Sequence, residues 1–264
     1  MREDFHMVPE VAELFRGHGI DQAGIWLGDP PGGSVDAMRM VRIALSLDET
    51  HDVWKVDLEG KGYYLKRRWE EPAGSLLRML FFGRKPVSSP IREVMLAARL
   101  KEAGFAVMEP VAWGEWRRRG LPAKGFLLSR EIPGRPVETI HAEGDAACRR
   151  DLLFRLGCLT GRLHVAGFFQ HVRLKDLIET EGGELVLIDR EAAKPWPRKF
   201  SWSLAVVCLA RTLRRTMRDG HRFAAGEASA FFRGYTGEVK GRSGLTAKEI
   251  RRSAMKRIRR ELGG

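Results

Sequence analysis

The chain has 264 residues, of which 44% are hydrophobic, and carries a formal net charge of +12 at pH 7. Its apolar runs fall short of the roughly 18 residues that a bilayer-spanning helix needs, which excludes an integral helical membrane protein. The amino-terminal residues lack the basic and long apolar segments of a secretory signal, so we expect a cytoplasmic protein.

The excess of positive charge predicts an anionic partner: a nucleic acid, a phospholipid surface or a phosphorylated substrate. Basic residues concentrate in a helix expected over residues 246–262. This helix has two interpretations, a packed helix with a solvated charged face or a docking element for anionic phospholipid or lipid A phosphates. The sequence lacks a zinc finger, a helix-turn-helix and an RNP-like aromatic pattern, so we do not expect nucleic acid to be the partner.

In chain order, residues 9–17 predict a short helix, and three strands follow at residues 40–47, 53–58 and 63–67. A hairpin turn at residues 59–62 joins the last two strands. Next come a short helix within residues 69–88, a longer helix over residues 90–104, and two apolar runs at residues 106–113 and 125–128. Residues 115–120, between these runs, are interpreted as an exposed hairpin tip.

After residue 133 the pattern becomes mainly helical, with helices expected at residues 151–164, 203–217, 224–235 and 246–262. The three cysteines Cys148, Cys158 and Cys208 lie in or just before segments that are expected to be helical, without CxxC spacing, and we interpret them as structural thiols. The sequence therefore predicts an α+β protein with two lobes, residues 1–132 and 133–264, whose seam falls near residues 131–135. Clefts between lobes are common ligand sites.

Four charged residues stand out by their order along the chain. Lys66 lies in the third strand, Glu93 lies in the first turn of the long helix, and Asp189 follows the apolar run 185–188. Asp176 precedes Asp189 by thirteen residues. Taken singly, Lys66 is an ordinary solvent-facing lysine and Glu93 an acid that favours a helix N-terminus. Taken together, their order is that of the parts of a protein kinase-like phosphotransferase.

The motifs YYLKR at residues 63–67, LHVAGF at residues 163–168 and LVLIDREAA at residues 185–193, with the block over residues 86–105, resemble the lipopolysaccharide core kinase family. This family comprises the Kdo and heptose kinases of Gram-negative bacteria and their InaA-like relatives. The resemblance spans roughly residues 40–235. It implies a bilobal protein kinase-like fold, with a small antiparallel β-sheet and one long helix in the N-lobe and a mainly helical C-lobe.

The resemblance also implies an ATP-dependent kinase that uses Mg²⁺ and phosphorylates a heptose or Kdo hydroxyl of the lipopolysaccharide inner core. We expect it to work at the cytoplasmic face of the inner membrane as a peripheral protein, without nucleic acid and without an obligate protein partner. By position, Lys66 corresponds to the phosphate-binding lysine, Glu93 to its partner and Asp189 to the principal metal ligand. Residues 129–132 correspond to the hinge whose backbone contacts adenine.

The chain departs from the family at the catalytic loop, where an aspartate usually serves as the base. Residues 169–176 read FQHVRLKD. Counting back from Asp189 places Asp176 at the second metal-ligand position and His171 at the base position, whereas counting forward from Gly167 places Val172 there. Neither alignment supplies an aspartate. A glycine-rich phosphate loop is also missing, and residues 29–34 are interpreted as an ordinary turn.

Three interpretations of this loop remain open. His171 orients or deprotonates the acceptor hydroxyl, since imidazole is a competent base near neutral pH. Alternatively, Asp176 takes the role of base and leaves one metal ligand weaker. In the third interpretation the protein is a pseudokinase that binds nucleotide or glycolipid without turnover.

Overall fold

The computed structural model describes residues 2–28, 38–45, 50–81, 83, 85–189 and 196–262. The expected turn at residues 29–34 lies outside these ranges. The chain forms two compact units. The first, here called the sheet unit, comprises Met1–Ile132 and Asp189–Pro195, and the second, the helical unit, comprises Pro133–Ile188 and Trp196–Gly264. Asp189 therefore packs with the sheet unit although the preceding residues belong to the helical unit.

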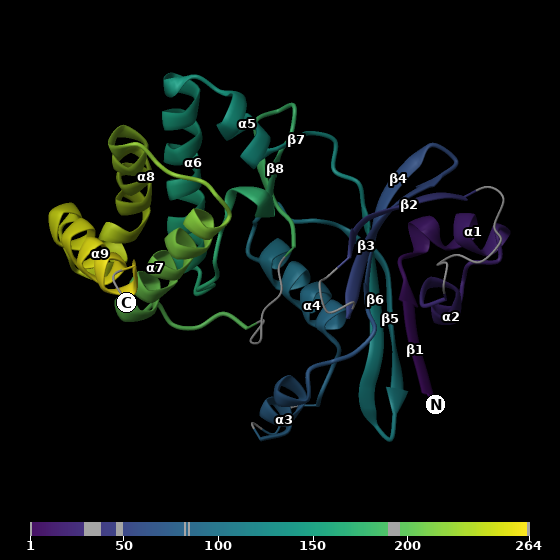
Figure 1. Ribbon diagram of the computed structural model, residues 1–264. Coiled ribbons are helices and arrows are strands. Elements are labelled where there is room, and N and C mark those ends of the chain that lie inside the picture. The colour runs from purple at the N-terminus through teal and green to yellow at the C-terminus, as the bar shows by residue number, and fades with distance from the viewer. Residues whose placement is uncertain are drawn as a thin grey trace. The chain divides into compact units, whose positions relative to one another are not determined.

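The sheet unit is built on a six-stranded sheet with the order β1-β5-β6-β4-β3-β2, in which all neighbouring strands are antiparallel (Figure 1). The strands are β1 (Arg2–Met7), β2 (Met38–Leu45), β3 (His51–Leu58), β4 (Lys61–Arg68), β5 (Pro110–Arg118) and β6 (Leu121–Arg130). The meander predicted from residues 40–67 is present as β2, β3 and β4. Strand β1, which pairs with β5, was not predicted.

The hairpin between β3 and β4 follows from its turn chemistry. Glu59 and Gly60 both adopt positive φ angles, 53° and 74°. A turn of this hand matches the natural twist of the two strands, and glycine adopts it without a steric penalty. The Asp57 carboxylate accepts a hydrogen bond from the Gly60 amide at 3.2 Å and holds the turn closed. This turn fixes which β4 side chains face the core.

Helices cover both faces of the sheet. On one face lie α1 (Pro9–Gly17) and α2 (Ala23–Trp26), whose Phe15 and Trp26 are fully buried against Tyr63 and Phe126. On the other face α4 (Ser89–Glu102) packs against β4, β5 and β6. The helix α3 (Ala73–Phe81) lies between β4 and α4 in the chain and stands away from the sheet in Figure 1.

The expectation of an exposed tip at residues 115–120 is wrong for two of its residues. Glu115 and Arg117 lie within β5, pair with each other, and are only 3% and 7% exposed. Their remaining polar atoms bind backbone of the segment before α4, because Glu115 accepts from the Ser88 amide at 2.8 Å and Arg117 donates to the Pro86 carbonyl at 3.0 Å. The exposed turn comprises residues 118–121.

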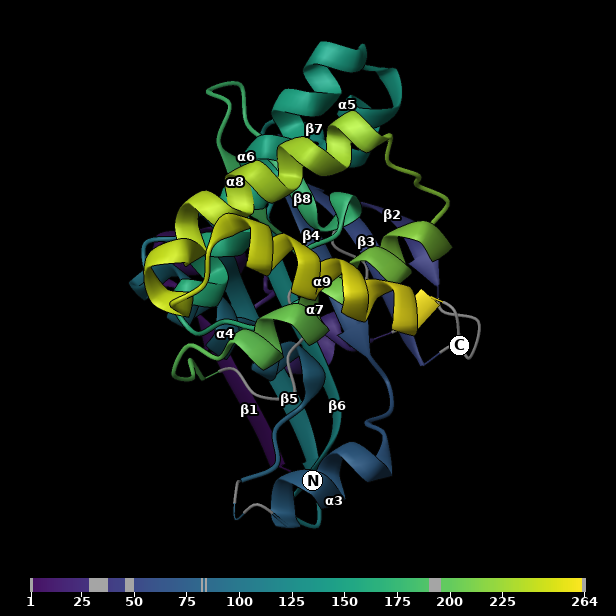
Figure 2. The ribbon, with the colours of Figure 1, turned by 90° about the vertical axis from the view of Figure 1, so that its left-hand side faces the viewer.

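Among the described residues, the helical unit contains four long helices, two shorter helical segments and a small sheet of order β7-β8-β9 (Figure 2). Its elements are β7 (Arg135–Pro136), α5 (Val137–Glu143), α6 (Ala146–Val165), the 3-10 turn η1 (Leu174–Asp176), β8 (Leu177–Glu179), β9 (Leu185–Leu187), α7 (Trp202–Arg218), α8 (Ala225–Ser243) and α9 (Ala247–Leu262). The predicted helices are present, and α6 and α8 are longer than expected.

Glycines allow α6 and α8 to approach closely. A Cβ atom at Gly157 of α6 would lie 2.1 Å from the Phe231 carbonyl oxygen, and one at Gly234 of α8 would lie 2.2 Å from the Phe154 carbonyl oxygen. The backbones of the two helices therefore meet at positions where no larger residue fits. Among the residues that the structure describes, none of the helices is long and apolar enough to cross a bilayer.

Candidate active site

Lys66 lies on the face of β4 that α4 covers. The strand alternates, with Tyr63, Leu65 and Arg67 buried toward α1 and α2 and the residues between them partly exposed on the other face. Lys66 is opposite Val53 in β3 and Leu127 in β6, so it sits in the interior of the sheet. Central placement on a rigid strand limits the directions in which the lysine side chain can reach.

The ammonium group of Lys66 joins two carboxylates. Its Nζ donates to Glu93 Oε1 at 2.7 Å and to Asp189 Oδ1 at 3.0 Å. Burial by itself lowers the pKa of Lys66, but the charges of Glu93 and Asp189 outweigh burial and hold the pKa above the ordinary lysine value. Lys66 therefore stays positively charged throughout the physiological range. The structure brings these three predicted residues together.

The two carboxylates differ in exposure. The Glu93 side chain is 7% exposed, whereas the Asp189 side chain is 55% exposed. Glu93 lies in the second turn of α4, five residues after the cap at Ser88, and not in the first turn as the sequence predicted. The buried Glu93 thus contacts the Lys66 ammonium on its protein side, and the exposed Asp189 contacts it on its solvent side.

Asp189 has an unusual backbone. Its φ angle is +55°, in the left-handed region that few residues other than glycine adopt, although aspartate tolerates it better than most. One residue, Ile188, separates it from the end of β9, and the Ile188 amide donates to the Asp176 carbonyl at 2.9 Å. Strained backbone at a single carboxylate is a common feature of functional sites.

Asp176 and His171 belong to the helical unit. The Asp176 side chain is 3% exposed, and both of its oxygens accept from the Arg173 guanidinium, Oδ1 from Nη2 at 2.8 Å and Oδ2 from Nε at 3.0 Å. The sequence did not identify Arg173, although a basic residue three positions before an aspartate was a visible signal. In this conformation Asp176 is held by a cation of its own chain.

The loop that carries His171 is anchored at several points. Gly167 has a φ of +89°, and a Cβ atom there would lie 2.1 Å from the Arg198 carbonyl oxygen. Cys208 of α7 donates through Sγ to the Gln170 carbonyl at 2.7 Å. His171 itself is partly exposed. These anchors hold the backbone that leads into the histidine.

The neighbouring His164 is a structural residue. It is fully buried, its Nδ1 lies 2.9 Å from the Tyr235 hydroxyl, and its ring stacks on Phe169. Burial, with a smaller contribution from the charge of His171, lowers the pKa of His164 to about 3. His164 is therefore neutral at physiological pH and packs the base of the loop.

The carboxylates of the site fit a divalent metal only together with ligands from a substrate. Among the described residues no group of three or more His, Cys, Asp or Glu side chains could enclose an ion. Mg²⁺, however, usually binds one or two carboxylates together with substrate phosphates and water. Asp189 fits that role because its carboxylate is more than half exposed. Asp176 fits it only if it shares or releases Arg173.

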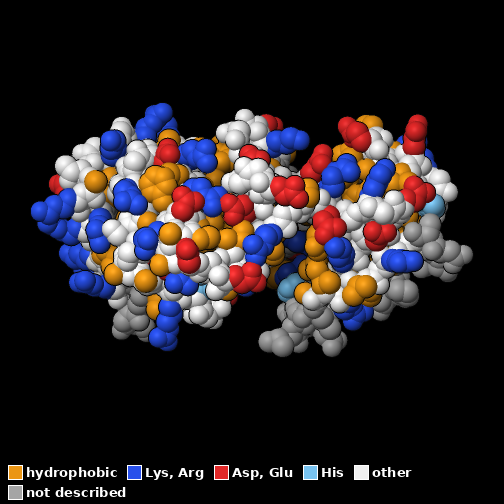
Figure 3. All heavy atoms as spheres, turned by 90° about the horizontal axis from the view of Figure 1, so that it is seen from above, with side chains coloured by type: hydrophobic (Ala, Val, Ile, Leu, Met, Phe, Trp, Pro, Cys, Tyr) orange, Lys and Arg blue, Asp and Glu red, His pale blue; other side chains and the backbone are white. Residues whose placement is uncertain are grey.

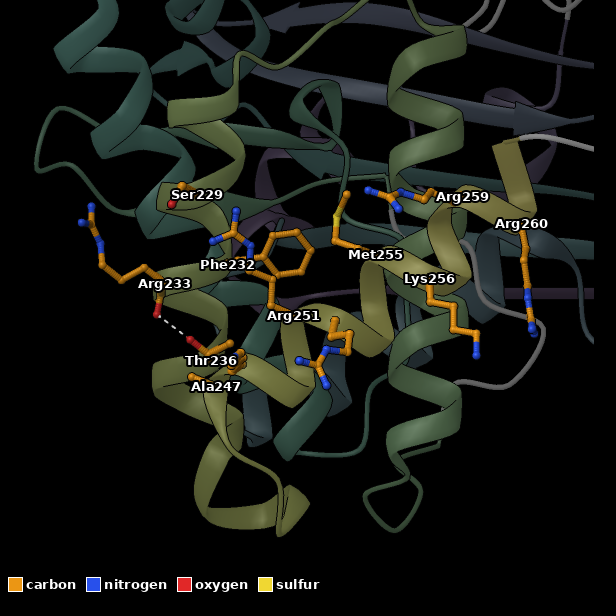
Figure 4. A pocket seen from close by; sticks show the side chains of 12 residues that line it. Ser229, Phe232, Arg233, Thr236, Ala247, Arg251, Met255, Lys256, Arg259 and Arg260 are labelled. Carbon is orange, nitrogen blue, oxygen red and sulfur yellow. Dashed lines mark hydrogen bonds between the residues drawn. The ribbon is translucent and has the colours of Figure 1, made fainter.

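A second candidate surface is a broad groove between α8 and α9, of about 880 Å³. Figure 4 shows Phe232 and Met255 between the two helices and the basic side chains around them. The residues that line the groove include seven cations and no carboxylate; the cations are Arg233, Lys248, Arg251, Arg252, Lys256, Arg259 and Arg260. Lys and Arg gather at this end of the helical unit, at the left of Figure 3. The groove fits an anionic, partly apolar partner.

The fold and the lysine–carboxylate cluster define a protein of the kinase-like class. The chain is similar to a solved structure of WaaP in complex with acyl carrier protein, with a TM-score of 0.58 and 18% identity over 97% of this chain and 99% of that chain. It is also similar to the crystal structure of an aminoglycoside-3'-phosphotransferase of type VIII, with a TM-score of 0.54 and 16% identity over 85% of this chain and 93% of that one. The predicted α+β kinase-like fold is confirmed.

The model of the lipopolysaccharide kinase (Kdo/WaaP) family matches residues 32–235, and the chain belongs to this family. Two curated relatives are lipopolysaccharide core heptose(I) kinases WaaP. The one from Escherichia coli strain K12 is 26% identical over 125 residues, 45% of this chain and 47% of the relative. The other, from Escherichia coli, is 26% identical over 151 residues, 55% of this chain and 56% of the relative. The chain thus spans about half the length of the curated relatives it matches.

Proposed function

We propose that the protein is an ATP-dependent kinase that phosphorylates a sugar hydroxyl, of heptose or Kdo, on the inner core of lipopolysaccharide. The observation that carries the proposal is the Lys66 ammonium held between the buried Glu93 and the exposed Asp189. An orienting glutamate, a phosphate-binding lysine and a metal-binding aspartate are the electrostatic parts that phosphoryl transfer requires. Family membership supports the same activity.

In this proposal residues 1–132 form the nucleotide-binding N-lobe, with residues 129–132 as the hinge, and residues 133–264 form the acceptor-binding C-lobe. Lys66 binds the phosphates of ATP, and Asp189 holds Mg²⁺, which neutralises phosphate charge when bound. The acceptor oxygen forms a bond to the γ-phosphorus, the bond from that phosphorus to the β–γ bridging oxygen breaks, and ADP leaves. The acceptor proton passes to a base on the protein.

We assign the base role to His171. Both oxygens of Asp176 accept hydrogen bonds from Arg173, so its carboxylate is already engaged within the protein. His171 lies in the anchored loop, is partly exposed, and has a side chain competent near neutral pH. Asp176 then serves as the second metal ligand by sharing its carboxylate between Arg173 and Mg²⁺.

We further propose that the groove between α8 and α9 holds the protein on the anionic surface of the cytoplasmic face of the inner membrane. Each basic residue near such a surface contributes about 1 kcal/mol to binding, and this attraction falls off within a Debye length of the surface. The seven cations of the groove and its apolar floor at Phe232 and Met255 support this partner. Peripheral binding would bring the enzyme to a lipid-linked acceptor.

A second candidate function is that of a nucleotide-binding protein without turnover. The observation that favours it is the Arg173–Asp176 ion pair, which occupies the one carboxylate of the loop at residues 169–176. Such a protein would bind ATP through Lys66 and would not transfer phosphate. Activity and binding must therefore be measured on the same preparation.

The test combines purified protein, ATP with Mg²⁺, and isolated lipopolysaccharide core, with mass spectrometry to detect the added phosphate and its sugar. Asp189→Ala should abolish transfer while the fold is retained. Asp21→Ala, at an exposed aspartate of the same unit, is the matched control and should transfer normally. Nucleotide binding without any phosphorylated product from the unmodified protein would reject the kinase and favour the second candidate.

The expectation that no protein partner is obligatory stays a prediction, because the relative WaaP has been solved in complex with acyl carrier protein. Mass spectrometry of the intact purified sample checks it. A stoichiometric small acidic protein that survives purification, and without which transfer stops, would contradict the expectation. Full transfer activity in a sample free of other proteins would confirm it.

A further inference from the structure

Helix α3 exposes large hydrophobic side chains that its packing does not require. Leu77 is 65% exposed, Leu80 is 49% exposed and Phe81 is 86% exposed, all within nine residues of helix. Isolated exposed hydrophobic residues are common on soluble proteins, but several on one short helix mark an interaction surface. The kinase site at Lys66 makes no use of them.

The base of this helix is built with buried polar contacts. Glu71, 6% exposed, precedes α3 and accepts from the Ser89 amide at 2.5 Å and the Ser89 hydroxyl at 3.1 Å. Arg92 approaches Glu71 at 3.6 Å. After α3, the Pro86 carbonyl accepts from the buried Arg117. Both ends of the segment are thus fixed to α4 and β5, so its exposed residues are held on a firm support.

A second exposed element lies at the same end of the sheet unit. The turn between β5 and β6 carries Arg118, Arg119 and Leu121, all exposed. The contacts of Arg117 with Pro86 and of Glu115 with Ser88 place this turn beside the segment that follows α3. Figures 1 and 2 both show α3 and the turn at one end of the unit.

The charge of this end identifies the partner. Residues 72–92 contain no Asp or Glu, and they include Arg78, Arg84 and Lys85 beside the leucines and phenylalanines. Exposed Leu and Phe flanked by Lys and Arg are the composition of helices that lie in the interface of an anionic bilayer. A protein partner would instead need a groove whose acidic residues lie opposite the cations of this helix.

We propose that α3 and the β5–β6 turn form a membrane-insertion element, in which Leu77, Leu80 and Phe81 enter the boundary between headgroups and acyl chains. The exposed Lys85, Arg118 and Arg119 contact anionic phospholipid headgroups. The element differs from the basic groove of the helical unit because it binds chiefly through apolar burial. Its use in reaching a lipid-linked acceptor rests on the proposed kinase function, but its binding to a bilayer does not.

The test measures sedimentation of the purified full chain with vesicles made of equal parts phosphatidylglycerol and phosphatidylcholine. Removing Leu77 and Phe81 together, as Leu77→Ser with Phe81→Ser, should weaken vesicle binding by at least about tenfold, because each side chain buries apolar area in the interface. The matched control is Val41→Ser with Ile43→Ser on β2, which are 65% and 52% exposed. The control should bind vesicles as the unmodified protein does.

Further measurements separate this element from the basic groove. At high salt, binding by charge alone is screened, and the remaining binding should depend on Leu77 and Phe81. Vesicles should also slow hydrogen exchange of the α3 amides. Unchanged vesicle binding by the α3 variant would overturn the inference, and so would dissociation of a dimer by that variant with vesicle binding intact, since a second copy would then cover α3.

The kinase reaction gives an independent comparison. The α3 variant should phosphorylate delipidated core oligosaccharide at the normal rate and lose rate on the same acceptor in vesicles. Absence of any transfer by the unmodified protein, with vesicle binding still dependent on α3, would reject the kinase and leave the inference standing. Equal rates of the variant and the unmodified protein on the vesicle-borne acceptor would count against the insertion element.

Discussion

Two adjacent cations on β4 are held by carboxylates in opposite ways. Arg67 faces the core, where Asp52 accepts from its Nε at 2.8 Å and its Nη2 at 2.5 Å, and where the Trp54 and Trp69 rings lie against the guanidinium. Lys66 faces α4 and meets Glu93 and the exposed Asp189. The side chains of Arg67 and Lys66 are 0% and 23% exposed.

We expect this difference to separate a structural ion pair from a functional one. Arg67 has a planar, bidentate partner and aromatic neighbours, so its charge is fully matched within the protein. Lys66 is a point charge whose second partner, Asp189, is open to solvent and has a strained backbone. A ligand phosphate can compete for Lys66 but cannot reach Arg67. We therefore expect changes at the two positions to affect different measurements.

The largest effect is expected for Lys66→Met. Loss of the ammonium removes a charge-assisted contact to the transferring phosphates, so transfer to core oligosaccharide should fall about a thousandfold, equivalent to ~4 kcal/mol. Steady-state kinetics with ATP and isolated core measures the loss. The variant also leaves Glu93 as a buried carboxylate without its lysine, which should lower the free energy of unfolding by about 2 kcal/mol or less.

The double variant Lys66→Met with Glu93→Gln distinguishes the two consequences. Neutralising Glu93 removes the buried charge, so the free energy of unfolding should recover most of its loss while transfer stays abolished. Urea unfolding and the transfer assay are run on the same samples. Recovery of transfer in the double variant would show that the lysine acts only on the fold and would contradict its functional assignment.

The second effect concerns Arg67. Asp52→Ala leaves a fully buried guanidinium without its carboxylate and should lower the free energy of unfolding by about 3 kcal/mol, the range measured for broken buried pairs. Transfer per folded molecule should change little, because Asp52 lies on the face of the sheet that α1 and α2 cover. A loss of transfer as large as that of Lys66→Met, with stability intact, would erase the distinction between the two cations.

The order of Lys66, Glu93 and Asp189 along the chain was sufficient to predict that they belong to one site, and the structure brings their side chains within hydrogen-bond distance. Their roles stay predictions, and Glu93 lies further into α4 than expected. The sequence did not reveal Asp52 as the partner of Arg67. Pairing across β3 and β4 depends on register, which the turn at Glu59 and Gly60 determines.

Other features depend on partners that are distant in the sequence. The sequence predicted Glu115 and Arg117 to be exposed turn residues, because a run of charged residues is usually exposed. They are buried because they form hydrogen bonds with backbone groups of Ser88 and Pro86. Strand β1 has mixed polarity and becomes a strand by pairing with β5. The ion pair between Arg173 and Asp176 is local, but the sequence does not say whether Arg173 or Lys175 forms it.

A third way to bury an ionisable group gives the next prediction. His164 is buried beside the Tyr235 hydroxyl and stays neutral, with a pKa lowered by burial to about 3 in the folded protein against 6.5 in the unfolded chain. Below pH 6.5 the unfolded chain binds a proton that the folded protein refuses, so stability is complete above pH 7 and decreases as pH falls toward 3. At pH 5 the loss from this residue should be about 2 kcal/mol.

The measurement is urea unfolding of the unmodified protein and His164→Gln at pH 7 and pH 5. Glutamine keeps a polar group near Tyr235 but does not titrate, so the decrease between the two pH values should be smaller in the variant by that amount. Comparing the differences cancels the shared titration of surface carboxylates. Equal decreases in both proteins would mean that His164 is protonated as readily in the folded state as in the unfolded one.

The smallest effect is expected for Lys55. Changing it tests whether a lysine affects phosphate transfer merely because it lies on this face of the sheet. Lys55 lies on the same face as Lys66, and its Nζ donates to Glu131 Oε1 at 2.6 Å, but its side chain is 46% exposed and that of Glu131 is 34% exposed. The Glu131 hydrogen bond raises the pKa of Lys55, yet solvent screens a pair this open. Lys55→Met should therefore change the free energy of unfolding by no more than about 0.5 kcal/mol. Transfer should stay within about twofold, since Lys55 has no strained, solvent-facing aspartate beside it. A loss of transfer as large as that of Lys66→Met would instead mean that Lys55 also contacts the phosphates. The proposed site would then extend to the hinge at residues 129–132.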